Sequence, residues 1–357
     1  MKFVTVVGAR PQFVKAGPLS AELRREHEEI LVHTGQHYDA EMSDVFFTDL
    51  DLPAADYHLG VGSGSHGAQT GLMLPAIEEV LVKEMPGAVI TYGDTNSTLA
   101  AGLAAAKLRI PVAHVEAGLR SFNRAMPEEI NRVLTDHLST WLFAPSTVAA
   151  EQLRREGIET GVHVVGDIML DALRMYRERA LAGSRVLEHL GLDARGYYVA
   201  TVHRAENVDD SDTIHEIFQA MNRLDRPVVL PLHPRTKERL RKFSVARGPR
   251  VRLVEPVGYL DMLALLSQAA CVLTDSGGVQ KEAYYLRVPC VTMRSETEWV
   301  ETVATGWNTV AGTDPERIVA AVRNRADGNT PHPDLYGDGF TARRIARVLS
   351  CVESPRS

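Results

Sequence analysis

Short apolar runs alternate with longer amphipathic stretches along the whole chain. In the first half, the apolar runs predict strands at 3–7, 29–34, 88–94, 111–117, 140–145 and 161–167. Between them, apolar residues recur at the spacing of one helix face, as at 95–108 and 127–139. This alternation predicts a mostly parallel sheet covered by helices on both faces. Because such sheets bind ligands at the carboxyl ends of their strands, the residues that follow the strands are the candidates for chemistry.

The alternation begins again after a polar, helix-rich bridge at 169–195. The second set of predicted strands lies at 197–203, 227–233, 251–257, 271–275 and 289–293, and an amphipathic pattern at 341–353 predicts a final helix. We therefore expect an α/β protein of two domains, residues 1–168 and 169–340, whose parallel sheets face each other across a cleft.

The composition is that of a soluble globular protein, with 45% hydrophobic and 24% charged residues. The 357 residues include 39 Lys and Arg against 46 Asp and Glu, which gives a net charge of −7. This charge argues against a nucleic-acid partner, which calls for a basic surface, but allows a small phosphorylated ligand. No apolar run approaches the ~18 residues of a membrane span, and the N-terminus lacks a signal-peptide pattern. We expect a cytoplasmic protein with no membrane partner.

The cysteines and histidines do not predict a metal site. Cys271, Cys290 and Cys351 are widely spaced, and the first two lie in apolar runs, so buried structural thiols are expected there. His33 and His37 straddle a glycine after a strand and have no third ligand nearby.

The segment Asp275-Ser276-Gly277-Gly278 joins a predicted strand to a helix. Free N–H groups and the helix dipole favour an anion at such a helix start, and glycines let phosphate oxygens approach the backbone. The segment predicts a phosphate-binding turn, although Ser276 would also serve as a simple helix cap. Glu282 lies early in that helix, either in reach of a bound ligand or on a solvated face.

The first predicted strand leads into Gly8, Arg10 and Lys15. A glycine here would permit a tight turn, and the two cations would suit a diphosphate, although solvated cations are the plain alternative. The segment lacks the GxGxxG fingerprint, so a nicotinamide or flavin cofactor is disfavoured.

Acidic residues follow the strands of the first domain, at Asp94, Glu116 and Glu128. Adjacent strands would bring them to one edge, where carboxylates suit proton transfer. Each would also serve to cap a helix. In the second domain, His203 and Arg204 end one predicted strand and His233 follows the next. This placement suggests one wall of a phosphate site, with plain surface loops after the strands as the equal alternative.

Several of these segments form a combination more specific than any one of them: GARPQFVK (8–15), GDTNSTLAA (93–101), HVEAGLRSFN (114–123), MPEEINRVLTDH (126–137), HRAEN (203–207), LHPRT (232–236), LTDSGGVQKEA (273–283) and TEWVE (297–301). In these motifs, and over nearly its whole length, the chain resembles the non-hydrolysing UDP-N-acetylglucosamine 2-epimerases. The resemblance implies a GT-B-like fold, a homodimer, and a C-terminal helix at 341–357 that packs back on the first domain. It also implies interconversion of UDP-GlcNAc and UDP-ManNAc, by elimination of UDP to a 2-acetamidoglucal and re-addition, without a cofactor or a metal.

The resemblance also implies roles for the candidate residues. The acid/base carboxylates would be Asp94, Glu116 and Glu128, and His203 would join them in catalysis while binding the diphosphate. The other implied substrate-binding residues are Arg10, Lys15, Ser276, Gly277, Gly278, Glu282, which would hold the ribose, and Glu298 in TEWVE.

Three departures from the common family pattern bear on substrate and regulation. Gln12 replaces a usual glutamate and TEWVE replaces TERPE, and both variants resemble relatives that epimerise UDP-2,3-diacetamido-2,3-dideoxyglucuronate for surface polysaccharide. A neutral Gln12 would not repel a substrate carboxylate. UDP-GlcNAc remains the first expectation. An allosteric pocket would be lined by Gln36, Arg204 and His233, but Asp39 and the glycine-rich loop at 60–71 depart from the usual residues. A GT-B glycosyltransferase, a hydrolysing epimerase and a non-catalytic sensor are the competing functions.

Overall fold

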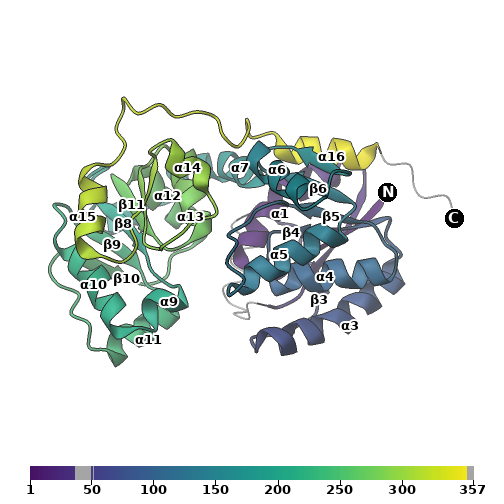
Figure 1. The fold of residues 1–357 in the computed structure, drawn as a ribbon, viewed down its shortest axis with the longest axis horizontal. Helices are drawn as coiled ribbons and strands as arrows, with labels where there is room; N and C mark the ends of the chain where they lie inside the picture. Colours follow the sequence, from purple (N-terminus) through teal and green to yellow (C-terminus); the bar gives the residue numbers. More distant parts are fainter. Residues whose placement is uncertain (37–49, 51, 352–357) are drawn as a thin grey trace. The chain divides into compact units, whose positions relative to one another are not determined.

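The structure is a computed structural model that describes residues 1–36, 50 and 52–351. The chain divides into two units, Met1–Met175 with Asp334–Ser357, and Tyr176–Pro333, each built around one parallel sheet (Figure 1). The boundary between Met175 and Tyr176 falls inside α7 (Ile168–Gly183), so this helix contributes residues to both units.

The first unit contains a seven-stranded sheet in the order β3-β2-β1-β4-β5-β6-β7, and every neighbouring pair is parallel. Its strands are β1 (Lys2–Val7), β2 (Glu28–His33), β3 (Tyr57–His58), β4 (Ala88–Tyr92), β5 (Val112–Val115), β6 (Trp141–Ala144) and β7 (Val162–Val164). The sequence pattern predicted all of them except β3, which is too short to show a period.

Helices cover this sheet: α1 (Arg10–Leu23), α3 (His66–Glu84), α4 (Asn96–Lys107), α5 (Pro127–Leu138), α6 (Thr147–Arg155) and the N-terminal part of α7. The alanine-rich α4 packs against both α3 and α5, since its small buried side chains permit a close approach. The glycine-rich segment at 60–71 is a loop only in its first part, because α3 begins at His66.

The last helix, α16 (Thr341–Ser350), belongs to the first unit and packs against α1. Asp171 of α7 accepts hydrogen bonds from the main-chain N–H groups of Thr341 (3.1 Å) and Ala342 (2.8 Å). These bonds satisfy two donors at the start of α16 and so fix where that helix begins.

The second unit contains a six-stranded parallel sheet in the order β10-β9-β8-β11-β12-β13. Its strands are β8 (Tyr198–Thr201), β9 (Val228–Pro231), β10 (Val251–Val254), β11 (Cys271–Thr274), β12 (Cys290–Thr292) and the unpredicted β13 (Asn308–Val310). Its helices are the rest of α7, α8 (Val186–His189), α9 (Ala205–Val208), α10 (Ser211–Asn222), α11 (Pro234–Lys242), α12 (Tyr259–Gln268), α13 (Gly277–Tyr285), α14 (Val300–Ala304) and α15 (Pro315–Arg323).

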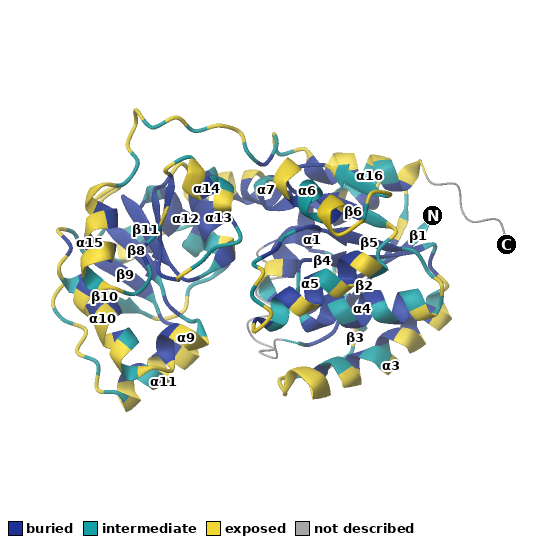
Figure 2. Cartoon of the chain, viewed as in Figure 1, coloured by how far each residue is buried: buried dark blue, intermediate teal, exposed yellow. Residues whose placement is uncertain are grey.

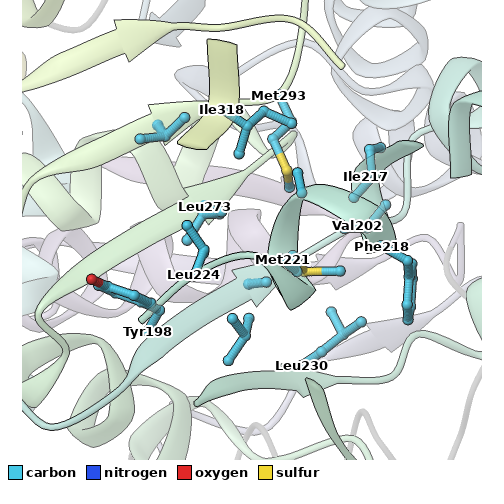
Figure 3. Packing of buried hydrophobic residues seen from close by; sticks show 14 of the residues in the cluster. Tyr198, Val202, Ile217, Phe218, Met221, Leu224, Leu230, Leu273, Met293 and Ile318 are labelled. Atoms are coloured by element: carbon cyan, nitrogen blue, oxygen red, sulfur yellow. The ribbon is translucent and has the colours of Figure 1, made fainter. Parts of the chain in front are cut away.

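The central strands of each sheet are largely buried between helices, which expose their outer faces (Figure 2). In the second unit, Phe218 and Met221 of α10 belong to one buried hydrophobic cluster with Tyr198 of β8 and Leu273 of β11 (Figure 3). Cys271 and Cys290 are buried as expected, and burial raises the pKa of Cys271 to about 12. Among the described residues, no helix is long and apolar enough to span a membrane.

Both sheets have the strand order of a Rossmann-like domain, which confirms the predicted fold class. The predicted cleft between the sheets stays a prediction. In each sheet the order reverses once, between β1 and β4 in the first unit and between β8 and β11 in the second. Ligands bind at the carboxyl ends of the strands at such switch points. The loops after these four strands are therefore the places where the fold favours a site.

Candidate functional site

The loop between β1 and α1 depends on a close approach of backbone to its neighbours. Gly8 was expected to allow a tight turn, yet its φ is not positive. A Cβ at Gly8 would lie 2.1 Å from Thr34 Oγ1 and 2.2 Å from Ser97 Oγ. The position therefore takes glycine because there is no space for a side chain. Arg10 is the first residue of α1 and is half-buried at this edge of the sheet.

Gln12 is a structural residue of this loop. It is 1% exposed, and its Oε1 accepts from the N–H groups of Gly8 (2.8 Å) and Ala9 (3.1 Å). Its Nε2 donates to the Tyr92 carbonyl (2.9 Å) and to Thr98 Oγ1 (3.0 Å). Both the oxygen and the nitrogen of the Gln12 amide therefore form hydrogen bonds within the protein. These bonds give a structural reason for an amide at position 12. The expectation that a neutral Gln12 would not repel a substrate carboxylate stays a prediction.

Lys15 and Glu116 form a buried ion pair between α1 and the end of β5, with both residues 8% exposed. Lys15 is thus not the solvated cation of the plain alternative. Gly93, which follows β4 with a φ of +61°, lies against this pair. A Cβ there would sit 3.1 Å from Glu116 Oε2 and 3.3 Å from Lys15 Nζ. Glu116 itself has a φ of +75°, a conformation uncommon for residues other than glycine and found where surrounding structure holds it in place.

Asp94 lies after β4, on the strand next to that of Glu116. Arg132 of α5 donates to Asp94 Oδ2 (2.5 Å), and Asn131 donates to the Asp94 carbonyl (2.9 Å). Asp94 does not cap α4, because that position belongs to Thr95, whose hydroxyl accepts from the Thr98 N–H. The two carboxylates therefore occupy neighbouring strand ends, each with its own cation.

Glu128 lies in the first turn of α5 and is half-buried. The next residue, Glu129, is buried and accepts from the N–H groups of Ser121 and Phe122, both at 2.9 Å. Glu129 thus ties the segment after β5 to α5, which carries Glu128 and Arg132.

A buried polar network that the sequence reasoning missed supports the turns after β4 and β5. His114 Nε2 is 2.7 Å from the Gly93 carbonyl oxygen, and its Nδ1 is 2.7 Å from Asp136 Oδ1. Asp136 Oδ2 also accepts from Arg120 (2.7 Å) and from the Gly118 N–H (3.1 Å). Burial alone would raise the pKa of Asp136, but the hydrogen bonds and charges of His114 and Arg120 outweigh it and lower that pKa.

In the second unit, His203 follows β8 and Asp275 follows β11 across the switch point. His203 Nδ1 lies 3.0 Å from Asp275 Oδ1, and the His203 ring centroid is 5.9 Å from that of His233. The His203 side chain is 37% exposed, whereas the carboxylate of Asp275 is fully buried. His203 is therefore an accessible imidazole held from behind by a buried carboxylate.

The predicted phosphate turn opens α13. Ser276 occupies the N-cap position, but its hydroxyl makes no capping hydrogen bond, so the simple-cap alternative is not realised. Gly277 is buried and Gly278 is exposed. Glu282 is 6% exposed, which contradicts a solvated helix face, and it helps to raise the pKa of the buried Tyr259 hydroxyl after the larger effect of burial.

Glu298 lies against the start of the same helix. A Cβ at Gly277 would be 2.4 Å from Glu298 Oε1. Arg294 Nη1 is 3.1 Å from Glu298 Oε2, and both side chains are largely buried. The structure therefore brings Glu298 to the predicted phosphate turn.

The candidate allosteric residues fall in different units. Gln36, in the first unit, accepts through Oε1 from the N–H (2.9 Å) and hydroxyl (2.7 Å) of Ser97, at the start of α4. Arg204 and His233 belong to the second unit, where the Arg204 N–H donates to Asp275 and His233 caps α11. His37 and Asp39 lie outside the described residues. In the described part of the chain, no group of three or more His, Cys, Asp or Glu residues is placed to hold a metal ion.

Comparison with known proteins identifies the family. The family model described as UDP-N-acetylglucosamine 2-epimerase matches residues 21–350. A Methanococcus maripaludis protein, named as a UDP-N-acetylglucosamine 2-epimerase homolog, is 49% identical over 98% of this chain and 99% of its own length. The Pseudomonas aeruginosa UDP-2,3-diacetamido-2,3-dideoxy-D-glucuronate 2-epimerase is 48% identical with the same coverage.

A solved structure extends the likeness to three dimensions. The UDP-GlcNAc 2-epimerase of Methanocaldococcus jannaschii, in complex with UDP-GlcNAc and UDP, has a TM-score of 0.92 and 43% identity, covering 98% of this chain and 99% of its own. The family model, the sequence identity and the fold agree, and the chain therefore belongs to the UDP-N-acetylglucosamine 2-epimerase family.

Proposed function

We propose that this enzyme interconverts UDP-GlcNAc and UDP-ManNAc by eliminating UDP and adding it back. The observation that carries the proposal is the pair of carboxylates at neighbouring strand ends, Asp94 after β4 and Glu116 after β5, each with its own cation. Proteins named UDP-N-acetylglucosamine 2-epimerase or UDP-GlcNAc 2-epimerase match 98% of this chain.

The reaction requires proton transfer at a carbon of low acidity. In the elimination, a carboxylate takes the C2 proton, and the electron pair of the C2–H bond forms the C1=C2 double bond. The C1–O bond breaks, and its electron pair leaves with UDP. The reverse addition returns a proton to the other face of C2, which calls for more than one acid/base group. Asp94, Glu116 and Glu128 are our candidates for these groups. Arg132 forms an ion pair with Asp94, and Lys15 forms one with Glu116.

The leaving diphosphate needs positive charge and N–H donors. At the start of α13, the Ser276 hydroxyl makes no capping hydrogen bond, and the backbone N–H groups of the glycine turn supply donors for phosphate oxygens. We assign Arg10, His203 and Gly278 to the same diphosphate, Glu282 to the ribose, and Glu298 to the rim of the site. Replacing Arg10 by Ala or Ser276 by Trp should weaken UDP binding measured by calorimetry, and unchanged affinity would remove either residue from the phosphate site.

Proton NMR of the protein with UDP-GlcNAc in heavy water tests the function directly. Appearance of UDP-ManNAc with deuterium at C2 is the expected result. The variants Asp94→Asn, Glu116→Gln and Glu128→Gln should bind UDP nearly as well as the unchanged protein while turning over about 10²–10⁴-fold more slowly. If all three keep near-normal rates, the carboxylate assignment is wrong.

A second candidate substrate is UDP-2,3-diacetamido-2,3-dideoxyglucuronate, as part of surface polysaccharide synthesis. The 48% identical relative named for that substrate supports it. Absence of deuterium exchange with UDP-GlcNAc, together with exchange at C2 of the diacetamido sugar nucleotide, would move the assignment to this substrate. A glycosyltransferase without an acceptor would show no deuterium exchange at C2 of either sugar nucleotide. A hydrolysing epimerase would release free UDP.

We also propose that the enzyme is a homodimer. Large apolar side chains are exposed on two helices of the first unit, namely Leu72 and Val82 on α3 and Ile130 and Leu134 on α5. Light scattering after size-exclusion chromatography tests this, and a mass of one chain would contradict it. The cytoplasmic location and the allosteric role of Gln36, Arg204 and His233 stay predictions.

A further inference from the structure

We propose that Asp275 is a positioning residue that fixes the orientation and tautomer of the His203 ring, an inference that rests on the function proposed above. β8 and β11 are paired neighbours at the point where the strand order of the second sheet reverses. His203 follows one strand and Asp275 follows the other, so two residues 72 positions apart in the sequence meet at the switch point.

The carboxylate of Asp275 is held in one orientation. Oδ2 accepts three hydrogen bonds, from the main-chain N–H of His203 (2.9 Å), the main-chain N–H of Arg204 (2.9 Å) and the side-chain amide of Asn207 (3.1 Å). Asn207 is itself anchored, since its amide also donates to the Met293 carbonyl at 2.9 Å. With Oδ2 fixed in this way, Oδ1 is a buried carboxylate oxygen that accepts no aligned hydrogen bond, and Nδ1 of His203 lies 3.0 Å from it, at ion-pair distance.

The charge of Asp275 determines where the ring proton sits. Burial by itself would raise the pKa of this carboxyl, but the hydrogen bond and charge of His203 and the two main-chain N–H groups lower it. An ionised carboxylate only accepts hydrogen bonds, and a buried carboxylate oxygen requires a donor. A small rotation of the His203 ring would align Nδ1–H with Oδ1, so we expect the ring proton on Nδ1. The neutral ring then has its free lone pair on Nε2. The cationic ring donates a hydrogen bond from Nε2, and the Asp275 carboxylate beside Nδ1 balances its positive charge. A leaving diphosphate needs a donor of this kind.

Asp275→Asn would reverse this arrangement with little change in shape. The three N–H donors require an oxygen on their side, which turns the amide NH₂ group toward His203 Nδ1. An NH₂ group only donates, so Nδ1 becomes the acceptor and the ring proton moves to Nε2. A carboxylate-to-amide change beside a catalytic histidine acts through the tautomer in other enzymes as well.

The tautomer is measured by two-bond ¹⁵N–¹H NMR of the full-length protein at alkaline pH, where the ring is neutral. The His203 signals are assigned by their absence from the His203→Gln spectrum. We expect a protonated Nδ1 in the unchanged protein and a protonated Nε2 in Asp275→Asn. A protonated Nε2 in the unchanged protein overturns the proposal, so the test stands even if the variant fails to fold.

Kinetics provide the second readout. Asp275→Asn should lower kcat by about 10²–10⁴-fold while KM changes by less than about tenfold, because the altered group acts on the departing diphosphate. The matched control is Asn207→Ala, which removes one donor to the same carboxylate but should keep Nδ1 protonated and kcat within about tenfold. Equal losses in both variants would indicate a merely structural role and overturn the proposal. An unchanged protein that shows no C2 exchange with either sugar nucleotide refutes the proposed function instead, while the NMR measurement still decides the tautomer.

Discussion

The side-chain amide of Gln12 donates to the main-chain carbonyl of Tyr92 at 2.9 Å, which ties the start of α1 to the end of β4. The second amide hydrogen goes to Thr98 Oγ1, so both contacts use Nε2 as a donor. A glutamate at this position would present an oxygen to two groups that now receive N–H bonds. The bond therefore explains why a neutral amide fits at position 12 without reference to the substrate.

Gln12→Glu should lower the free energy of unfolding by about 1–3 kcal/mol at neutral pH, the usual cost of mispairing a buried polar group. Burial would raise the pKa of the new carboxyl, so the protonated form would be the better tolerated one. The destabilisation should consequently shrink as the pH falls and grow as it rises. Urea unfolding at pH 5 and pH 8 measures this. If the variant keeps its stability and instead switches preference between the two sugar nucleotides, the charge at position 12 acts on the substrate rather than on the fold.

The ion pair of Lys15 and Glu116 makes a separable prediction about stability and activity. Lys15→Met takes the cation from a buried carboxylate and should destabilise the protein by about 3–5 kcal/mol. The double variant Lys15→Met/Glu116→Gln removes both charges and should recover most of that loss. Neither protein should turn over substrate. Thermal unfolding and the heavy-water assay test the two halves, and a double variant less stable than Lys15→Met would show that the pair is not the main interaction of Glu116.

Gly93 allows a comparison between backbone strain and contact with the site. Gly93→Ala adds a Cβ at a φ of +61°, 3.1 Å from the Glu116 carboxylate. Gly157→Ala is the matched control, because its φ is +81° and nothing lies within 4 Å of the added atom. Both should lose about 1 kcal/mol of stability from the left-handed conformation. Only Gly93→Ala should also slow turnover, and equal kinetics in the two variants would contradict a close fit around Glu116.

The sequence was sufficient to predict the two parallel sheets and most of the strand ends at which the candidate residues lie. Asp94, Glu116, His203 and Ser276 were found because each directly follows an apolar run, and a parallel sheet gathers such positions at one edge. Their partners were not found. Arg132, His114 and Asp136 sit inside helical or strand patterns, where a polar residue gives no sign of what it will face.

The sequence pattern also does not show whether a residue type is required by its backbone conformation or by a tertiary contact. Gly8 reads as a turn residue, but its need for glycine comes from Thr34 and Ser97, which approach it from other elements. Gln12 reads as a departure from a motif that bears on the substrate, but its amide also bonds the Tyr92 carbonyl, 80 residues later in the chain. In both cases the physical cause is a tertiary contact between segments far apart in the chain, which local propensity does not encode.

The last prediction concerns Asp136, which balances His114 and Arg120 beneath the turns that carry Asp94 and Glu116. Asp136→Asn removes the negative charge from this buried network and should cost about 3–5 kcal/mol at neutral pH. The folded state lowers the pKa of Asp136, so its stabilising effect is present above the ordinary Asp pKa of about 4 and is lost as the pH falls through the lower folded value. The stability gap between the unchanged protein and the variant should therefore be constant from pH 8 to pH 5 and narrow in more acidic solution.

Asp210→Asn, an exposed helix cap at which Asn serves equally well, is the control and should show little change in calorimetric Tm. A gap for Asp136→Asn that widens with acid would mean that the carboxyl is neutral in the folded protein and that hydrogen bonding alone holds the network.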